Sequence, residues 1–268
     1  MEASVAFPSL EVDLTLGRHE DRTLPVRFLL EGESAILGVA GPSGSGKSTL
    51  LRTIAGLEPA SGSIVVDGIP WSDPVRKVHR PLEDRSVAYL PQTFCLFPHM
   101  NVRENLLFAA QLVQKGARGP GFFSGTGAVR RKALSDEVCR MTEMFGISDL
   151  LERKVSGLSG GQTMKVALAR CFLKPARIYL LDEPLSGIDP AGRQFLSGLI
   201  PGLLRDTRAL ALWVTHAPEE LIPVLDGLAV FPEEGGTFES ERITGGRRRS
   251  LGVAGSSLQF GARIGGKG

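Results

Sequence analysis

The stretch that most constrains this chain is a glycine-rich loop that follows a short apolar run. Residues 35–40 (AILGVA) are typical of a buried parallel strand, and residues 49–55 indicate the first turns of a helix. The loop between them fits the pattern G-x-x-x-x-G-K-[ST] and comprises Gly41, Pro42, Ser43, Gly44, Ser45, Gly46, Lys47, Ser48 and Thr49. This order predicts a phosphate-binding site, because backbone N–H groups of the loop and of the helix N-terminus point at the bound anion. We expect Lys47 to reach the β- and γ-phosphates and the Ser48 hydroxyl to take a Mg²⁺ position.

A second apolar run ends in two adjacent carboxylates. Residues 178–181 (IYLL) precede Asp182 and Glu183, which predicts a buried strand whose charges lie at the carboxyl edge of the sheet. Asp182 can hold Mg²⁺ through water, and Glu183 can polarise an attacking water as a general base. An isolated pair of this kind is more often a solvated strand end, so its meaning depends on the loop and on the motifs below.

Length, charge and composition limit the classes of protein to which this chain can belong. The chain has 268 residues, a net charge of +2, many glycines and few aromatic residues. It is long enough for one large domain with a subdomain, and it lacks the polybasic character of a nucleic-acid binder. No apolar run is long enough to span a bilayer, and no signal peptide is visible at the N-terminus. The widely spaced Cys95, Cys139 and Cys171 are interpreted as reduced thiols of a cytosolic protein.

Further motifs follow in a recognisable order. Gln92 ends the run Tyr-Leu-Pro-Gln, Leu158 opens the pentapeptide Leu-Ser-Gly-Gly-Gln, residues 186–189 read Ser-Gly-Ile-Asp, and His216 ends Trp-Val-Thr-His. With the phosphate loop and Asp182-Glu183, these residues closely resemble the ATP-binding subunit of ABC (ATP-binding cassette) transporters. The resemblance runs from about Leu10 to about Phe231, and it identifies the Q-loop, the signature, the D-loop and the switch histidine.

The resemblance implies an α/β fold: a phosphate-loop NTPase cassette with a parallel core sheet, an N-terminal antiparallel β-subdomain and an inserted helical subdomain at about 101–160. The cassette is expected over 1–244, and the Gly/Ser-rich tail 245–268, with its Arg triplet, is expected to be disordered. Residues 115–127 are Gly-rich and basic and predict a mobile surface loop.

Periodicity and turn signals predict the remaining elements of the cassette. The expected strands are 10–16, 26–30, 64–68, 85–90, 209–214 and 228–231, with 237–243 pairing beside the last, and the expected helices after the signature are 162–172 and 190–204.

The resemblance also implies a mechanism and its residues. Glu183, His216 and Lys47 are the expected catalytic groups of ATP hydrolysis, and Ser48, Gln92 and Asp182 the expected Mg²⁺ ligands. The signature and D-loop residues are expected to cap the ATP of a second, head-to-tail copy of the chain; they are Ser159, Gly160, Gly161, Gln162 and Asp189. Where the family has an aromatic residue that stacks on adenine, this chain has Arg18-His19, so a guanidinium or imidazole plane is expected to substitute.

Residues 92–106 resemble the corresponding segment of importers of molybdate, sulfate, sugars and polyamines, and the whole most resembles the molybdate-type subunit without its regulatory domain. The implied partners are transmembrane permease subunits and an extracytoplasmic solute-binding protein, at the cytoplasmic face of the inner membrane, with no nucleic acid. Phe94, Leu96, Phe97 and His99 are candidates for the permease-binding surface, with ordinary packing as an equal alternative.

Two other functions stay open at this stage. One is an ABC-type ATPase that acts on nucleic acid or ribosomes, although such proteins usually carry two cassettes, coiled coils or zinc motifs. The other is a cassette that binds ATP without hydrolysing it, against which Lys47, Glu183 and His216 argue.

Overall fold

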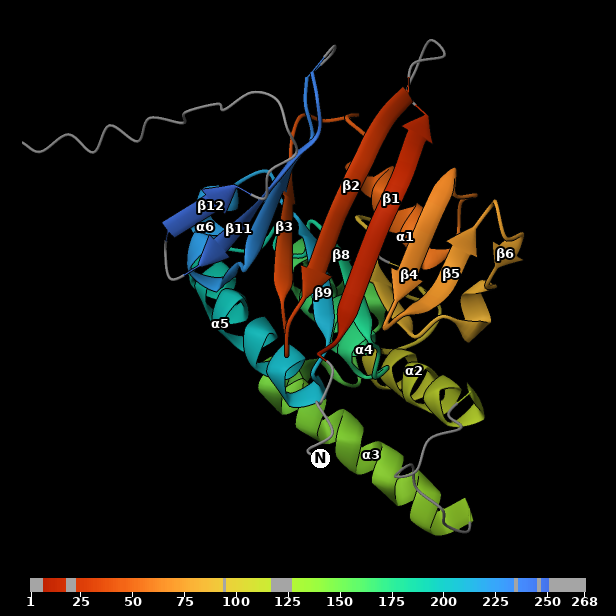
Figure 1. Cartoon of the computed structure of the whole chain (residues 1–268). Helices are drawn as coiled ribbons and strands as arrows, with labels where there is room; N and C mark the ends of the chain where they lie inside the picture. The colour runs from red at the N-terminus through yellow and green to blue at the C-terminus, as the bar shows by residue number, and fades with distance from the viewer. Residues whose placement is uncertain are drawn as a thin grey trace, which may run out of the picture.

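The computed structural model describes residues 7–17, 23–93, 95–116, 127–233, 236–244 and 247–250; of these, 112–116, 127–131, 241–244 and 247–250 are described by their backbone alone. Two sheets stand next to each other, and the long helices lie along one side of the molecule (Figure 1). The α-helices are α1 (Lys47–Ala55), α2 (Val102–Gly116), α3 (Gly127–Met144), α4 (Gly160–Phe172), α5 (Pro190–Thr207) and α6 (Pro218–Leu221). Short 3₁₀ turns span Leu82–Asp84, Ser148–Leu150, Val155–Gly157 and Ile222–Val224.

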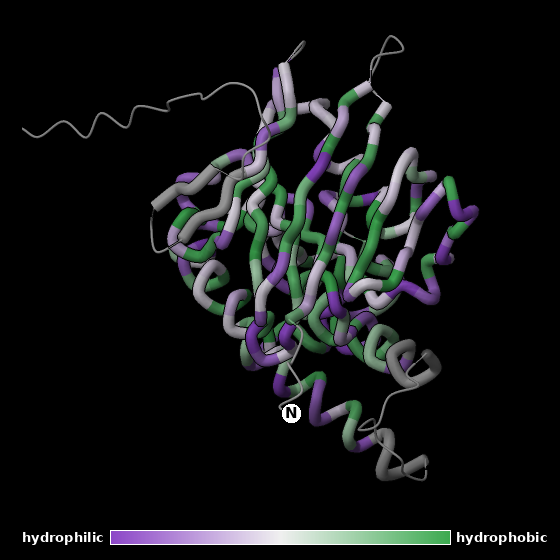
Figure 2. The backbone as a smooth tube through the Cα atoms, in the orientation of Figure 1, coloured by the Kyte–Doolittle hydropathy of each residue, from purple (hydrophilic) through white to green (hydrophobic). Residues whose placement is uncertain are grey.

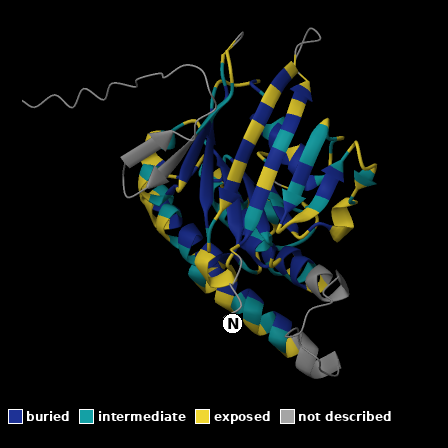
Figure 3. Cartoon of the chain, in the orientation of Figure 1, coloured by how far each residue is buried: buried dark blue, intermediate teal, exposed yellow. Residues whose placement is uncertain are grey.

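The first sheet is antiparallel and has the strand order β2-β1-β4-β5-β6. Its strands are β1 (Ser9–Gly17), β2 (Thr23–Glu31), β4 (Gly62–Val66), β5 (Ile69–Asp73) and β6 (Val78–His79). Buried and less buried residues alternate along β1 and β2, as Figure 3 shows by the banding of these two strands. One face of the sheet therefore covers the core and the other faces solvent, which is the pattern that an antiparallel sheet commonly shows.

The second sheet has the order β12-β11-β10-β3-β9-β8-β7, and its five strands from β10 to β7 are parallel. They are β3 (Ile36–Ala40), β7 (Val87–Leu90), β8 (Ile178–Asp182), β9 (Leu210–Val214) and β10 (Gly227–Val230), and the antiparallel edge is β11 (Glu239–Thr244) and β12 (Arg247–Ser250). Every residue of β3, β8 and β9 is buried, and these strands form the hydrophobic centre of Figure 2. Continuous apolar runs are typical of parallel strands that are covered on both faces.

Two apolar clusters lie on the two faces of the parallel sheet. One joins β1, β2 and α1 to residues such as Leu37 and Leu180. The other joins α2, α3, α4 and α5 to residues such as Ile36, Tyr179 and Trp213. Successive residues of one strand thus pack into opposite clusters. The antiparallel sheet and α1 cover one face of the parallel sheet, and the long helices cover the other.

Some sequence predictions differ from the structure. Strands β5 and β6 were not predicted, because residues 69–79 contain prolines and charged residues rather than an alternating pattern. Residues 247–250 fall in the tail that was expected to be disordered, but they form β12 against β11. That expectation is wrong for this segment, because ladder hydrogen bonds come from the backbone and do not require apolar side chains. The expected loop 115–127 is helical at both ends, in α2 and α3, and residues 117–126 lie outside the described residues, as do residues 251–268.

Candidate nucleotide-binding site

The carboxyl ends of four parallel strands bring the predicted residues to one edge of the sheet. Val39 of β3 and Asp182 of β8 both pair with Val214 of β9, and Leu90 of β7 pairs with Leu181 of β8. The residues that follow these strand ends are Gly41, Gln92, Glu183 and His216. An edge of this kind is where open α/β sheets bind their ligands.

The phosphate loop is shaped by three glycines with positive φ, namely Gly41 (142°), Gly44 (75°) and Gly46 (106°). A Cβ on Gly41 would lie 2.7 Å from both the Cβ and the carbonyl oxygen of Phe231, so a side chain at this position would displace the loop. Gly46 is the N-cap of α1 and offers no side-chain hydrogen bond to the first turn. The N–H groups at the start of α1 are therefore available for an anion.

Lys47 is buried and folds back over the loop. Its Nζ donates to the carbonyl oxygens of Gly41 (2.9 Å) and Pro42 (2.7 Å), so its ammonium group is held above the loop. Burial lowers the pKa of Lys47, and the nearby carboxylates of Glu183 and Asp182 oppose this change. The charges of Lys47, Asp182 and Glu183 thus influence one another. A phosphate group bound over the loop would lie against the ammonium group of Lys47.

Asp182 ends β8 with only 2% of its surface exposed. Burial raises the pKa of Asp182, while a hydrogen bond from the Ser48 hydroxyl and the charges of Lys47 and His216 act in the opposite direction. Its Oδ1 is buried and has no hydrogen-bond partner among the described residues. A buried carboxylate oxygen without a partner beside a serine hydroxyl is the donor set that a hard divalent cation takes.

Glu183 and His216 form a direct pair at the same edge. Nε2 of His216 lies 2.6 Å from Oε1 of Glu183, and the glutamate side chain is 15% exposed against 48% for the histidine. Glu183 has a left-handed backbone (φ 52°), which non-glycine residues seldom adopt, and its N–H donates to the carbonyl oxygen of Val214 (3.2 Å). Strain of this kind is maintained where the surroundings fix the side chain in a functional position.

The signature lies at the start of α4. The Ser159 hydroxyl accepts from the N–H of Gln162 (3.3 Å), and the Gln162 side chain accepts from the N–H of Ser159 (3.0 Å), which makes a capping box. A Cβ on Gly161 would lie 3.3 Å from the carbonyl oxygen of Gly187 in the D-loop, whereas Gly160 has open space around it. In the described part of the chain, no hydrogen bond joins the signature to the phosphate loop.

The other predicted residues lie in different places: one caps a helix, one is exposed, and two are outside the described part of the chain. Asp189 is the N-cap of α5, and the bond that it accepts from the N–H of Gly192 (2.9 Å) lowers its pKa. Gln92 is exposed two residues beyond β7. Arg18, predicted to stack on adenine, and Phe94, a candidate for the permease surface, lie outside the described residues.

The sequence reasoning missed two polar side chains, the buried Asn105 and the partly exposed Arg170, which bind the backbone of the loop that follows Gln92. It also missed Arg85, which is buried away from the site and binds the carbonyl end of α1. An asparagine one turn into an apolar helix was the available signal for Asn105, because such a residue is unfavourable there unless its amide finds partners.

Comparison with known proteins agrees with this arrangement. Residues 29–186, which contain the phosphate loop, the signature and Asp182-Glu183, match the ABC transporter family. The chain belongs to this family. It is 35% identical over 201 residues to the trehalose/maltose import ATP-binding protein MalK of Thermococcus litoralis, covering 75% of this chain and 50% of that protein. It is likewise 35% identical over 226 residues to the molybdenum import ATP-binding protein ModC of Pseudomonas savastanoi pv. phaseolicola, covering 84% of this chain and 58% of the relative.

The chain therefore spans about half the length of these relatives. Among solved structures, it resembles a dimeric ATP-binding cassette in a post-hydrolysis state bound to ADP and Pi, with a TM-score of 0.68 at 23% identity, covering 88% of this chain and 99% of that one. It also resembles an inward-facing metal-chelate type ABC transporter, with a TM-score of 0.66 at 20% identity, covering 88% and 83%. These likenesses confirm the predicted ABC cassette fold. None of the helices in the described ranges is both long and apolar enough to cross a bilayer.

Proposed function

We propose that this chain is an ATP-hydrolysing subunit that energises a membrane importer of a small solute. The observation that carries the proposal is the meeting of Lys47, Asp182 and the Glu183–His216 pair at one edge of the parallel sheet, beside a phosphate loop. These groups supply what phosphoryl transfer to water requires, namely positive charge for the phosphates, a metal ligand and a base for the water.

The residues divide the reaction between them. Lys47 and the N–H groups of the loop bind and neutralise the β- and γ-phosphates. Glu183 orients a water for in-line attack and accepts its proton, so that the products are ADP and inorganic phosphate. His216 holds the carboxylate of Glu183 in place and donates toward the γ-phosphate. Gln92 completes the surroundings of the γ-phosphate from the end of β7.

Mg²⁺ fits this site. Ser48 and Asp182 would hold it, with Gln92 as a further ligand, and the unpartnered Oδ1 of Asp182 supports this assignment. When bound, the cation neutralises charge on the phosphate oxygens. The Ser48 hydroxyl donates to Asp182 and thereby favours its ionised form.

The proposal includes a head-to-tail dimer of the chain. The signature residues are satisfied within their own capping box, while the open space at Gly160 leaves the start of α4 free to approach a nucleotide. In this arrangement, Lys47 of one protomer binds the ATP, and the signature of the other protomer caps it, through Ser159, Gly160, Gly161 and Gln162. Asp189 belongs to the same cap, because it follows Gly187, whose carbonyl oxygen lies close to Gly161.

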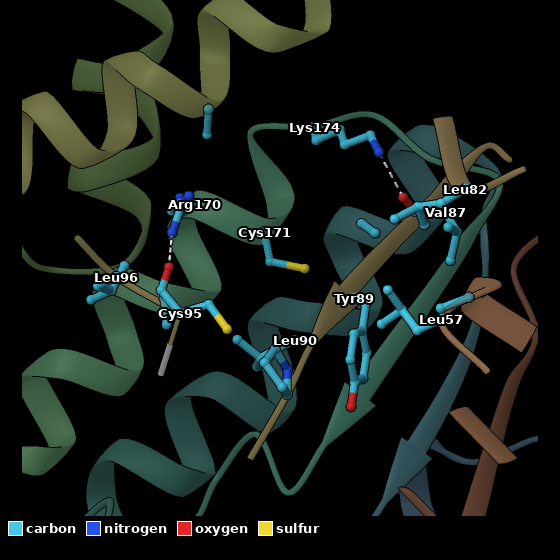
Figure 4. Close-up of a pocket in the computed structure, with 15 residues that line it drawn as sticks. Leu57, Leu82, Val87, Tyr89, Leu90, Cys95, Leu96, Arg170, Cys171 and Lys174 are labelled. Carbon is cyan, nitrogen blue, oxygen red and sulfur yellow. Dashed lines mark hydrogen bonds between the residues drawn. The ribbon is translucent and has the colours of Figure 1, made fainter. Parts of the chain in front are cut away.

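A permease subunit would bind beside the Q-loop. A cavity of about 300 Å³ lies along the free edge of β7, between the end of α1 and α4 (Figure 4). Apolar side chains and two cationic ones line it, among them Leu57, Leu82, Leu96, Arg170 and Lys174. A shallower groove over α2 includes the predicted residue His99. Leu57 and Leu82 are large apolar side chains that are 48% and 39% exposed, as expected for a surface that another protein covers.

The relatives named as import proteins for molybdenum and for sugars support an importer, with a molybdate-like oxyanion as the first solute to test. An importer assembly would also include an extracytoplasmic solute-binding protein, and this subunit would lie at the cytoplasmic face of the inner membrane. No nucleic-acid partner is proposed, because the net charge is only +2.

The decisive experiment mixes two inactive variants of the chain. Lys47→Met removes the phosphate-binding cation, and Gly160→Val blocks the signature. If each ATP lies between protomers, a mixed dimer contains one intact pair of elements, and ATP turnover rises well above that of either variant alone. The control mixes Lys47→Met with Glu183→Gln, which leaves no intact site. Turnover that does not rise on mixing, with each variant folded, contradicts the shared site.

A further inference from the structure

The loop that follows Gln92 is bound to the helices rather than to the sheet. Asn105, in the first turn of α2, has no exposed surface. Its Oδ1 accepts from the N–H of Phe97 (2.8 Å), and its Nδ2 donates to the carbonyl oxygens of Phe97 (3.1 Å) and Asn101 (3.0 Å). One amide thus pairs with both backbone groups of Phe97, as a neighbouring strand would.

Asn105 is not needed to begin the helix. The N-terminus of α2 already has a capping box, in which the N–H of Asn101 donates to Glu104 and the N–H of Glu104 donates to Asn101, both at 2.8 Å. An asparagine inside a helix is less favourable than alanine or leucine, and a buried amide without partners destabilises the fold. The hydrogen bonds to Phe97 offset both effects, so the side chain serves the loop.

Arg170 of α4 binds the same loop from the other side. Its Nη1 donates to the carbonyl oxygen of Cys95, the contact that Figure 4 draws between these two residues. Its guanidinium lies 4.8 Å from the ring centroid of Phe97, and that ring packs edge-on against Phe108 of α2 at 4.9 Å. Residues 95–97 are therefore attached to α2 and α4 together.

The other end of the loop is attached to the sheet. Leu90 pairs with Leu181, the residue before Asp182, so the chain leaves the core two residues before Gln92. From Gln92 to Cys95 an extended chain covers at most roughly 10 Å. If α2 and α4 move relative to β8, the short segment from Gln92 to Cys95 must accommodate the movement. Gln92 therefore moves relative to Asp182.

We propose that Asn105 is a positioning residue that sets the place of Gln92 against the γ-phosphate and links it to the orientation of α2 and α4. The proposal rests on the proposed function. The expected effect is selective: the affinity for ATP, which has a γ-phosphate, depends on the hydrogen bonds between Asn105 and Phe97, whereas the affinity for ADP does not. Loss of these bonds therefore changes the preference for ATP over ADP rather than nucleotide binding as a whole.

The test uses Asn105→Asp in the full chain, since a carboxylate has the same shape and still accepts from Phe97 but repels its carbonyl oxygen. ATP and ADP affinities are measured by calorimetric titration with Mg²⁺, all in a Glu183→Gln background that prevents turnover. The expected result is an ATP affinity about tenfold weaker with ADP affinity unchanged within about twofold, a difference of the size of one hydrogen bond.

The matched control is Thr142→Val, a buried polar residue of α3 whose hydroxyl donates to Cys139 and does not contact the loop. It should lower stability without changing the ratio of the two affinities. Equal weakening of ATP and ADP by Asn105→Asp, or the same ratio as the control, overturns the proposal. If Asn105→Asp does not fold, Arg170→Met decides by the same ratio, because Arg170 binds the other side of the loop. Failure of the reference protein to bind ATP would instead refute the proposed function.

Discussion

Nε2 of His216 lies 2.6 Å from Oε1 of Glu183, so the predicted general base is held by the predicted switch histidine. The two residues follow neighbouring strands, β9 and β8, and Glu183 has a left-handed backbone. The position of the carboxylate thus depends on the histidine and on a strained main chain together.

This pair predicts the effect of Glu183→Gln. The amide can still hydrogen-bond to His216, but it cannot accept a proton from water, so ATP turnover should fall by roughly 10²- to 10⁴-fold while ATP binding persists. Phosphate release and nucleotide titration measure the two effects separately. The exposed Glu219→Gln is the control and should leave turnover unchanged. Equal rates for Glu183→Gln and the unaltered chain would refute the role of Glu183.

The buried carboxyl of Asp182 predicts a pH dependence of stability. Burial raises the pKa of Asp182 above its ordinary value of 3.8, so the folded protein retains this proton to higher pH than the unfolded chain does. The stabilisation from this group is complete below that ordinary value and is lost as pH rises through the raised pKa. The free energy of unfolding of Asp182→Asn, relative to the unaltered chain, should therefore increase as pH rises through this interval, as urea denaturation would measure.

Mg²⁺ should reverse this loss in the unaltered chain. A cation at Asp182 favours the ionised carboxylate, so Mg²⁺ with ATP should raise Tm for the unaltered chain more than for Asp182→Asn. The exposed Asp206→Asn should respond as the unaltered chain does. The same Mg²⁺-dependent rise in Asp182→Asn would show that the cation binds elsewhere.

The sequence predicted the ends of the parallel strands, but it did not predict the buried polar side chains that bind the backbone, and this difference has a physical reason. The runs before Gly41, Asp182 and His216 are continuous and apolar, which is how a strand covered on both faces must look. Arg85 bonds to the backbone of Thr53 and Ile54, which lie far from it in the chain, and Asn105 bonds to the backbone of the irregular loop before its helix. Backbone donors and acceptors carry no sequence signal. The contact between Gly161 and Gly187 likewise follows from the packing of α4 against the D-loop, which no local pattern encodes.

Arg85 predicts a large stability effect away from the site. This residue is 3% exposed, and its guanidinium donates to the carbonyl oxygens of Thr53 (3.2 Å), Ile54 (2.7 Å) and Arg80 (2.9 Å). Arg85→Met removes the donor to the carbonyls of Ile54 and Arg80 and one of two donors to Thr53, which also accepts from the N–H of Gly56; it should lower the free energy of unfolding by about 2–4 kcal/mol. Urea denaturation measures the change. Arg76→Met, at an exposed arginine, should change stability by less than about 0.5 kcal/mol, and a similar value for Arg85→Met would contradict the role given to its hydrogen bonds.

A substitution at Gly160 is predicted to weaken dimerisation without lowering stability. A Cβ there meets nothing within 4 Å in the single chain, and Gly160 is the first residue of α4, where alanine is a good helix former. Gly160→Ala should therefore keep its Tm and bind ATP as a monomer, yet its methyl group should occupy the space that the partner's nucleotide requires.

The ATP-bound dimer is measured by sedimentation in a Glu183→Gln background, where we expect the dimer to form about tenfold more weakly, a change of about 1.4 kcal/mol. Gly157→Ala is the matched control, because it is also in open space and precedes the signature. It should dimerise normally, since its methyl group lies outside the predicted nucleotide contact. If Gly160→Ala dimerised as readily as Gly157→Ala, the start of α4 would not be the surface that caps the partner's ATP.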